Sequence, residues 1–496
     1  MLAYEAEKDS FPRYSVFNPV TMLDAAGMLD RLPDVFAISG WGKGTLAPNN
    51  SIGAGYDGVS DADRQVHSAN VFGRRVRVFS SSHALSHIWG SYGMSPYEQG
   101  RPCYALVWEG ALGDFYEVDA QLHVHHLGQV MKAPGNKYSF LYALADPAAT
   151  LPRGHVRYSD PGKLMALCAY GEPGDPTPEE RDVIDPLLDH PSFLDLAKDD
   201  LRDSPYYNIG VRSPAFTRLA KRFSDELFRR FEQFARRHLT KGYPLLVSGG
   251  CGLNCDWNSA WRAGGLFEDV FVPPCANDTG SAIGTAIDAM REFTGEAKVS
   301  WDVYRGQEFV DDRPDMPDVL VRELDYDEVA GFLADDRVVA WANGRCELGP
   351  RALGNRSLLA APFSAQTTAR LNKIKEREDF RPIAPICLEE DVERHFEWTG
   401  PSPHMLYFQT VRDQKLEAVI HVDGTTRAQT VRADQNPMMH ALLTRFRDRT
   451  GTGVLCNTSL NYHGSGFINR TSDLYSYCKH HGVDAFVHSG RFCRFQ

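Results

Sequence analysis

The chain has no hydrophobic run near the roughly 20 residues that cross a bilayer. Its first residues, MLAYEAEKDSFPRYS, show no basic start followed by an apolar stretch. It also lacks an excess of positive charge, because 65 acidic against 53 basic side chains give a formal net charge of -12. These absences argue against a membrane partner, against export and against a nucleic-acid partner. We therefore expect a cytoplasmic protein.

Closely paired cysteines are also missing. The ten cysteines are scattered, and Cys251 and Cys255 stand four positions apart, wider than the usual spacing in a cytosolic zinc site. We interpret all of them as reduced thiols, and these two as buried. The chain shows no internal repeat, no low-complexity segment, no Walker loop and no dinucleotide-binding fingerprint.

The chain does contain a series of strand, loop and helix units. Its 496 residues exceed one ordinary core, so we expect two domains. The patterns predict strand-to-helix units within 74–93, 243–264 and 269–295, a β-hairpin or meander within 103–127, helices within 325–336, 364–379 and 437–451, and strands within 337–342 and 453–460. A polar, aperiodic stretch near 298–316 separates the two groups. The fold class is α/β.

Two histidines and one aspartate are candidate metal ligands. His83 and His87 are spaced i, i+4, which puts both imidazoles on one helical face. Ala84 stands where a metalloprotease helix has glutamate, so metal-dependent peptide hydrolysis is not supported. Asp278 is expected to end a strand and to hold a metal or the Mg²⁺ of a nucleotide. The alternatives are two unrelated histidines and a plain helix cap.

Glycines and arginines mark two candidate anion sites. Gly249, Gly250 and Gly252 lie between a predicted strand and a predicted helix, where backbone N–H groups can face a phosphate; a tight structural turn is the alternative. The second site begins in NGRCELGPRALGNRSLLAAP (343–362). Its expected members are Arg345, Arg351, Lys375, Arg377, Arg381, Arg427 and Asn457. Guanidinium groups in loops of an acidic chain suggest one shared pocket for a small anion, whereas Arg370 and Lys373 are interpreted as solvated.

Several of these stretches together resemble one family. They are NGRCELGPRALGNRS, REDFRPIAP, HVDGTTRAQTV, LCNTSLN, SSHALSHIWGSYGMSPY, GKLMALCAYGEP and SGGCGLNCDWN. The resemblance is to O-carbamoyltransferases of the nodulation and antibiotic-biosynthesis type, and it covers most of the chain. YEAEKDSFPRY and LVWEG are similar to the members that carbamoylate a 3-hydroxymethylcephem.

The resemblance implies a domain organisation. Residues 1–300 would form an actin/Hsp70-like ATPase-type domain for carbamoyl transfer, 301–316 a linker, and 317–496 a twisted α/β domain that binds carbamoyl phosphate and ATP and forms carbamoyl-adenylate. Relatives begin with a strand and a His-Asp phosphate loop ahead of the segment that here follows Met1. The expectation is therefore that the start is misassigned or that the first strand is missing.

The resemblance also implies the reaction and its residues. The co-substrates would be carbamoyl phosphate and ATP with Mg²⁺, and the acceptor a small-molecule alcohol. Carbamoyl transfer to a protein or tRNA and a non-catalytic carbamoyl-phosphate-binding module are the alternatives, and a homodimer is the expected assembly. Implied metal ligands for Fe²⁺, Mn²⁺ or Zn²⁺ are His83, His87, Asp278 and Glu109, with Asp114 as an alternative to Glu109. Implied catalytic residues are His83, Asp278, Arg351 and Asn457; carbamoyl-phosphate ligands are Arg345, Arg351, Arg381, Arg427 and Asn457; nucleotide ligands are Gly249, Gly250, Gly252, Asn254 and Lys163.

Overall fold

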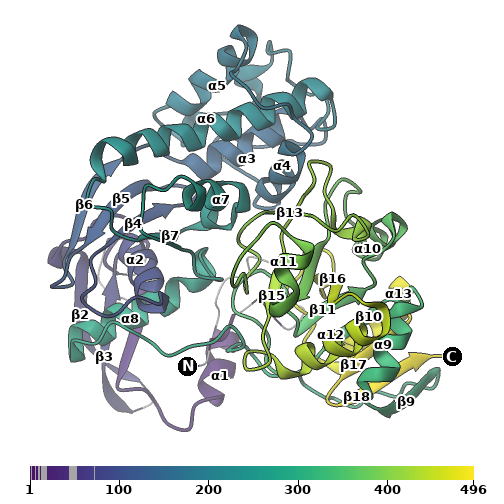
Figure 1. Ribbon diagram of the computed structural model, residues 1–496. Helices are drawn as coiled ribbons and strands as arrows, with labels where there is room; N and C mark the ends of the chain where they lie inside the picture. Colours follow the sequence, from purple (N-terminus) through teal and green to yellow (C-terminus); the bar gives the residue numbers. More distant parts are fainter. Residues whose placement is uncertain (2, 6, 9–11, 13–18, 44–52, 72) are drawn as a thin grey trace. The chain divides into compact units, whose positions relative to one another are not determined.

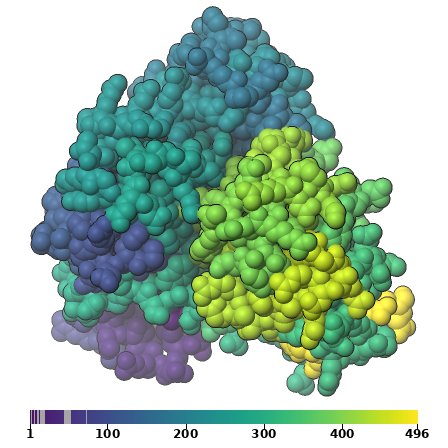
Figure 2. Space-filling view, in the orientation of Figure 1, coloured from purple at the N-terminus to yellow at the C-terminus, as the bar shows by residue number. Residues whose placement is uncertain are grey.

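A computed structural model describes residues 1, 3–5, 7–8, 12, 19–43, 53–71 and 73–496 (Figure 1). The chain forms two compact units, one of residues 33–300 and one of residues 1–32 with 301–496. We call them the N-terminal and the C-terminal unit. Figure 2 shows the surface of the molecule in the same colours. The YEAEKDSFPRY stretch lies partly outside the described residues.

The N-terminal unit contains a five-stranded sheet in the order β6-β5-β4-β7-β8. Its strands are β4 (Cys103–Trp108), β5 (Gly113–Val118), β6 (Val124–Gln129), β7 (Leu245–Ser248) and β8 (Val270–Phe271). β4, β5 and β6 pair antiparallel, so of the predicted hairpin or meander the structure has the meander, whereas β7 pairs parallel with both β4 and β8. β4 and β7 are buried along their whole length, as expected for strands covered on both faces.

Helices cover both faces of this sheet. The helices are α2 (His83–Met94), α3 (Pro134–Ala145), α4 (Asp160–Cys168), α5 (Pro178–Asp189), α6 (Pro214–His238), α7 (Cys255–Ala263) and α8 (Ser281–Thr294). Figure 1 shows α3 to α6 gathered on one side of the sheet. On the other side α2 contacts β4 and β7, while α8 contacts α2 and a three-stranded sheet of β1 (Val35–Ser39), β3 (Arg74–Ser81) and β2 (Arg64–Val71).

The contact between α2 and α8 depends on a glycine. A Cβ at Gly284 would overlap the carbonyl oxygen of Ser86, so the helix backbones come closer than any other residue allows. The hydroxyls of Ser86 and Thr285 meet across the same contact at 2.7 Å. This close packing fixes the start of α8 relative to the helix that carries both histidines.

The C-terminal unit contains an eight-stranded mixed sheet in the order β15-β12-β16-β11-β10-β17-β18-β9. Its strands are β9 (Val319–Glu323), β10 (Val339–Ala342), β11 (Arg356–Ala360), β12 (Ala384–Leu388), β15 (Gln429–Val431), β16 (Val454–Ser459), β17 (Ala485–His488) and β18 (Arg491–Phe495). The unit also contains a short pair, β13 (Gln409–Thr410) with β14 (Thr425–Thr426), and helices α1 (Pro19–Gly27), α9 (Tyr326–Ala334), α10 (Ala365–Ile374), α11 (Val392–His395), α12 (Pro437–Thr450) and α13 (Thr471–His481). Alternate residues of β10 enter the two cores, with Trp341 in the one formed with α9 and α12 and Ala342 in the other.

The segment 301–316, predicted to be a linker, belongs to the C-terminal unit. Gly306 N donates to Cys346 O at 2.9 Å, Cys346 N donates to Gln307 O at 2.8 Å, and Val310 N donates to Asn469 O at 2.8 Å. The segment lacks apolar periodicity because its backbone pairs with loops rather than with a core. The chain passes from one unit to the other after residue 32 and after residue 300, so residues 1–32, predicted in the first domain, belong to the C-terminal unit. The functional division of the domains stays a prediction.

All ten cysteines are buried, and none forms a disulfide. Cys251 and Cys255 are thus buried, as expected. Among the described residues, no helix combines the length and the apolar character that membrane crossing requires.

Candidate functional site

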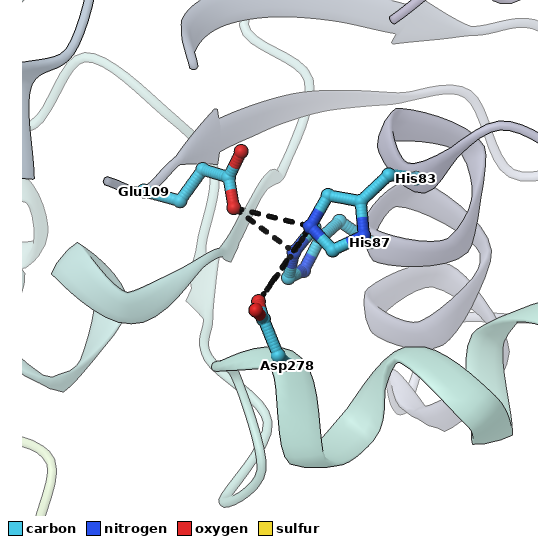
Figure 3. A group of neighbouring side chains, drawn as sticks. All are labelled: His83, His87, Glu109 and Asp278. Carbon is cyan, nitrogen blue, oxygen red and sulfur yellow. Dashed lines mark hydrogen bonds and ion pairs between the residues drawn. The ribbon is translucent and has the colours of Figure 1, made fainter. Parts of the chain in front are cut away.

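Four predicted side chains converge in the N-terminal unit (Figure 3). His83 Nε2 lies 3.1 Å from His87 Nε2 and 3.2 Å from Glu109 Oε2. His87 Nε2 lies 3.5 Å from the same carboxylate oxygen and 3.4 Å from Asp278 Oδ1. One ligand atom from each residue lies within 4.8 Å of the others. The i, i+4 spacing therefore does place both imidazoles at one point.

The start of α2 is fixed by its cap. Ser82 precedes the helix, and its side chain accepts a hydrogen bond from Leu85 N at 3.1 Å, as the sequence predicted for a serine cap. Two further amides of the first turn are satisfied by the chain ahead of β2, because His83 N donates to Gly55 O at 3.1 Å and Ala84 N to Tyr56 O at 3.0 Å. The histidine helix is thereby tied to residues 55–56.

The structure brings Glu109, and not Asp114, to the histidines. Glu109 directly follows β4, and its side chain is 5% exposed. Asp114 lies on β5 and accepts hydrogen bonds from His126 at 2.9 Å and from Gln129 at 3.3 Å. Asp278 was expected at a strand end, which is wrong: β8 ends at Phe271, and Asp278 begins a 3-10 turn ahead of α8. The close α2–α8 contact, rather than a strand, carries it to the site.

Charge in the cluster is mutually stabilised. Burial disfavours every charged form, but hydrogen bonds with Asp278 and Glu109 outweigh it and raise the pKa of His83, and that of His87 to about 9. Against the same burial, the histidines lower the pKa of Glu109 to about 2 and hold that of Asp278 well below its usual range. Asp278 is the accessible member, with 53% of its side chain exposed.

Two aromatic residues that the sequence analysis missed complete the surroundings. Tyr56 stacks on His83 with ring centroids 4.5 Å apart, and its hydroxyl donates to Glu109 Oε1 at 2.7 Å. Burial and the Glu109 carboxylate raise the pKa of Tyr56, so the hydroxyl keeps its proton. Trp41 is 60% exposed and lies 5.1 Å from the His83 ring. No local pattern marks either residue, because their partners are distant in sequence.

The donor set fits a divalent transition metal. Two imidazole nitrogens and two carboxylates make a mixed nitrogen–oxygen set, which suits Fe²⁺, Mn²⁺ or Zn²⁺ better than Mg²⁺. The two negative charges also balance a divalent cation. Figure 3 shows the two imidazoles, Asp278 and one oxygen of Glu109 directed toward one another.

The glycine turn has a structural basis. Gly249 has φ of 91°, and a Cβ there would overlap the Trp108 carbonyl oxygen. Asn254 caps α7 by accepting hydrogen bonds from Asp256 N and Trp257 N at 3.1 and 3.4 Å. Lys163 lies on α4, with its Nζ 5.5 Å from the centre of the Tyr142 ring. The predicted strand, turn and helix are confirmed, and nucleotide binding by this turn stays a prediction.

Two buried charged side chains, Glu347 and Arg356, hold the arginine-rich loop of the C-terminal unit through hydrogen bonds to its backbone. Glu347 is fully buried, and its Oε1 accepts from the backbone N–H groups of Leu353, Asn355 and Arg356 at 2.6, 2.8 and 3.2 Å. Arg356 is also fully buried, and its guanidinium donates to Asn343 O at 3.1 Å and to Gly344 O at 2.9 Å. Arg356 therefore shapes the loop instead of facing solvent.

Three other arginines lie close together. Burial and the positive charges of Arg381 and Arg427 lower the pKa of Arg377 to about 9. The Arg377 guanidinium is held by the chain, because it donates to Asn372 Oδ1 at 2.6 Å and to Pro382 O at 3.3 Å. Arg351 is half-buried in the loop, whereas Arg345 turns toward the 306–308 segment and donates to Gly306 O at 3.0 Å.

Asn457 links the loop to the sheet. Its Nδ2 donates to Ala352 O at 3.1 Å and to Gln429 Oε1 at 3.0 Å, while no described residue donates to its buried Oδ1. Asn457 was predicted to donate to a carbamoyl oxygen. Both of its amide hydrogens are directed to the chain, so the side chain offers an acceptor instead.

Comparison with known proteins defines the class. Residues 67–189 and 219–287 match the family model described as carbamoyltransferase N-terminus, and residues 330–494 match the one described as carbamoyltransferase C-terminus. The chain therefore belongs to the carbamoyltransferase family, which makes it a transferase. The predicted resemblance is confirmed, and the mixed α/β two-unit architecture agrees with it.

Individual relatives extend the match. A protein of Amycolatopsis lactamdurans named 3'-hydroxymethylcephem-O-carbamoyltransferase is 49% identical over 98% of this chain and 94% of its own. A Streptomyces clavuligerus protein of the same name is 48% identical over the same shares. Nodulation protein U of Rhizobium tropici is 33% identical over 94% of this chain and 87% of its own.

Proposed function

We propose that this protein is an ATP-dependent O-carbamoyltransferase whose acceptor is the hydroxyl group of a 3'-hydroxymethylcephem, in antibiotic biosynthesis. In the C-terminal unit, water releases phosphate from carbamoyl phosphate to give carbamate. Carbamate attacks the α-phosphorus of ATP, pyrophosphate leaves, and carbamoyl-adenylate forms. In the N-terminal unit the acceptor hydroxyl attacks the carbamoyl carbon, AMP leaves, and the hydroxyl proton passes to a base.

One observation carries the choice of acceptor. Two proteins named for O-carbamoylation of a 3'-hydroxymethylcephem are 49% and 48% identical to this chain over 98% of its length. Such identity extends through both units rather than over one shared module. A small-molecule alcohol is thus favoured over a protein or tRNA acceptor.

The N-terminal cluster supports the transfer step. His83, His87, Glu109 and Asp278 would hold one divalent transition metal. A bound cation of this kind supplies Lewis acidity for a carbonyl group. Asp278, the accessible carboxylate of the set, is assigned to the side of the cluster that the acceptor approaches, and proton removal from the acceptor hydroxyl is assigned to a side chain of this cluster. Gly249, Gly250, Gly252, Asn254 and Lys163 are assigned to the nucleotide.

The arginines of the C-terminal unit support the first step. Carbamoyl phosphate and ATP with Mg²⁺ bring several negative charges to one site, and Arg345, Arg351, Arg381 and Arg427 are assigned to neutralise them. Asn457 is assigned to the carbamoyl amide through its unused acceptor oxygen.

Three further assignments accompany the proposal: a fold, a location and an assembly. The actin/Hsp70-like ATPase fold of the N-terminal unit is supported by two sheets with helices between them. A cytoplasmic location is supported by ten cysteines without a disulfide. Homodimer formation stays a prediction.

The test is a reconstituted reaction. The protein is incubated with ATP, carbamoyl phosphate and a panel of alcohols that includes a 3'-hydroxymethylcephem, and pyrophosphate and carbamoylated products are measured. We expect pyrophosphate release and a carbamoyl mass added to the cephem. Pyrophosphate release with another alcohol as the preferred acceptor would overturn the cephem assignment, and carbamoyl transfer without pyrophosphate would overturn the adenylate route.

A further inference from the structure

The two oxygens of the Glu109 carboxylate have different partners. Oε2 faces both imidazoles, at 3.2 Å from His83 Nε2 and 3.5 Å from His87 Nε2. Oε1 instead accepts the hydroxyl hydrogen of Tyr56 at 2.7 Å. The Tyr56 hydroxyl therefore binds the carboxylate oxygen of Glu109 that does not face the histidines.

Tyr56 is itself held by the histidine helix. Its backbone oxygen accepts a hydrogen bond from Ala84 N at 3.0 Å, and the preceding Gly55 O accepts one from His83 N at 3.1 Å. Its ring lies on the His83 imidazole at a centroid distance of 4.5 Å and an interplanar angle of 18°. Backbone and side chain together leave the hydroxyl little freedom relative to the cluster.

This restraint matters because Glu109 is a glutamate. A glutamate has one more rotatable bond than an aspartate, and its carboxylate can bind a cation through one oxygen or two. A hydrogen bond to one oxygen fixes the orientation of a ligating carboxylate and reduces its capacity as a second ligand atom. Among the described residues, Tyr56 donates the hydroxyl hydrogen bond to the Glu109 carboxylate.

We propose that Tyr56 is a positioning residue that restricts Glu109 to binding a divalent metal through Oε2 alone. The inference rests on the metal site of the proposed function, but it does not depend on which acceptor is carbamoylated. It assigns a role to a residue that no motif indicates, and it explains how a glutamate can serve as a single-oxygen ligand.

The test uses Co²⁺ as a spectroscopic probe of the metal-free, full-length protein. In Tyr56→Phe, Glu109 is released and can offer both oxygens. We expect the visible Co²⁺ bands to weaken and shift, as they do when the coordination number rises, and the Co²⁺ affinity to change by about 10- to 100-fold. Tyr92→Phe is the matched control, because it removes a buried tyrosine hydroxyl from the histidine helix α2 that does not contact Glu109; Tyr92 Oη accepts from Gly100 N at 2.9 Å. Its Co²⁺ spectrum should equal that of the unmodified protein.

A second pair of variants tests the same contact from the Glu109 side, and the single variant Glu109→Asp keeps Tyr56 intact. Glu109→Asp shortens the carboxylate away from Tyr56, so adding Tyr56→Phe to it should leave the Co²⁺ spectrum and affinity unchanged. Additive effects in the double variant, or an unchanged spectrum in a folded Tyr56→Phe protein, would overturn the inference. The Co²⁺ measurements use no substrate. Their result is therefore independent of whether the carbamoylation assay succeeds.

Discussion

At the scale of single residues, one side chain in the β4–β5 hairpin decides the composition of the metal site. Glu109 and Asp114 are both buried acidic residues of this hairpin, yet Glu109 faces the two histidines and Asp114 is occupied by His126 and Gln129. The difference arises from the meander geometry, which directs the residue after β4 toward α2. The choice between the two carboxylates was open in the sequence.

The first prediction contrasts these two carboxylates. Glu109→Gln should lower divalent metal content, because a neutral amide replaces a charge-assisted contact whose loss costs about 1.5–3 kcal/mol. Asp114→Asn should keep the metal, because its partners lie outside the cluster. Elemental analysis of both purified proteins checks this. Retention of metal in Glu109→Gln together with loss in Asp114→Asn would assign the ligand the other way.

The second prediction concerns acid stability. His488 is fully buried between Phe309 and Phe486, and burial lowers its pKa from the usual 6.5. The unfolded chain then binds a proton near pH 6.5 that the folded chain does not, so stability should fall as pH drops below about 6.5. His488→Phe should reduce this loss, measured as the change in melting temperature between neutral and mildly acidic pH. His480→Phe, at an exposed site on α13, is the control, and an equal acid loss in both variants would contradict the assignment.

Residue-level prediction from sequence succeeded where spacing carries the information. His83 and His87 share a helical face by their spacing alone, whereas the placement of Glu109 followed only from the family resemblance. Tyr56 and Glu347 were missed because their partners are set by tertiary structure. Tyr56 is separated from Glu109 by 53 positions and carries no motif.

At the scale of elements, two helices packed through a glycine bring the ligands together. His83 and His87 lie on α2, and Asp278 lies just ahead of α8. Gly284 allows the helix backbones to touch, so the distance between Asp278 and the histidines depends on a residue outside the site. A metal held by these residues would therefore depend on the packing of one helix pair.

The third prediction tests that coupling. Gly284→Ala should destabilise the N-terminal unit by about 1–3 kcal/mol through overpacking and should lower metal content, because α8 must move from α2. Gly90→Ala is a matched control in the same contact, since its added Cβ would meet Gly284 Cα at an ordinary 3.5 Å. Melting temperature and elemental analysis report both effects. Equal behaviour of the two variants would show that the contact can relax without moving Asp278.

The sequence predicted elements well where local patterns define them. The strand, serine cap and helix at β3 and α2 were expected, as were the turn after β7 and the helices α9 and α12. The segment 301–316 looked like a linker because backbone pairing with remote loops leaves no periodic pattern. Asp278 was placed at a strand end for a similar reason, since the path of 272–277 after β8 depends on its surroundings.

At the scale of the whole molecule, the metal cluster and the arginine site belong to different compact units. Under the proposed function each unit carries one half-reaction. This division predicts that point changes in the full-length chain can remove one step and leave the other.

The fourth prediction separates the two steps. His87→Ala should abolish carbamoyl transfer to the alcohol and leave pyrophosphate release near normal. Arg427→Ala should reduce pyrophosphate release by roughly ten- to a hundredfold, since one charge-assisted contact is worth about 1.5–3 kcal/mol, while metal content stays unchanged. Arg432→Ala is the matched control, because Arg432 is exposed and pairs with Asp434. Equal loss of both steps in either variant would show that the units do not divide the reaction.

The buried cysteines make it possible to measure how often each unit opens. Five lie in each unit: Cys103, Cys168, Cys251, Cys255 and Cys275 in the N-terminal one, and Cys346, Cys387, Cys456, Cys478 and Cys493 in the C-terminal one. A thiol reagent can reach them only when the surrounding structure opens, so labelling rates read by mass spectrometry measure the breathing of each unit separately. ATP with carbamoyl phosphate should slow labelling of the second group more than the first, because a ligand stabilises the unit that binds it. Equal slowing in both groups would mean that the two units open as one.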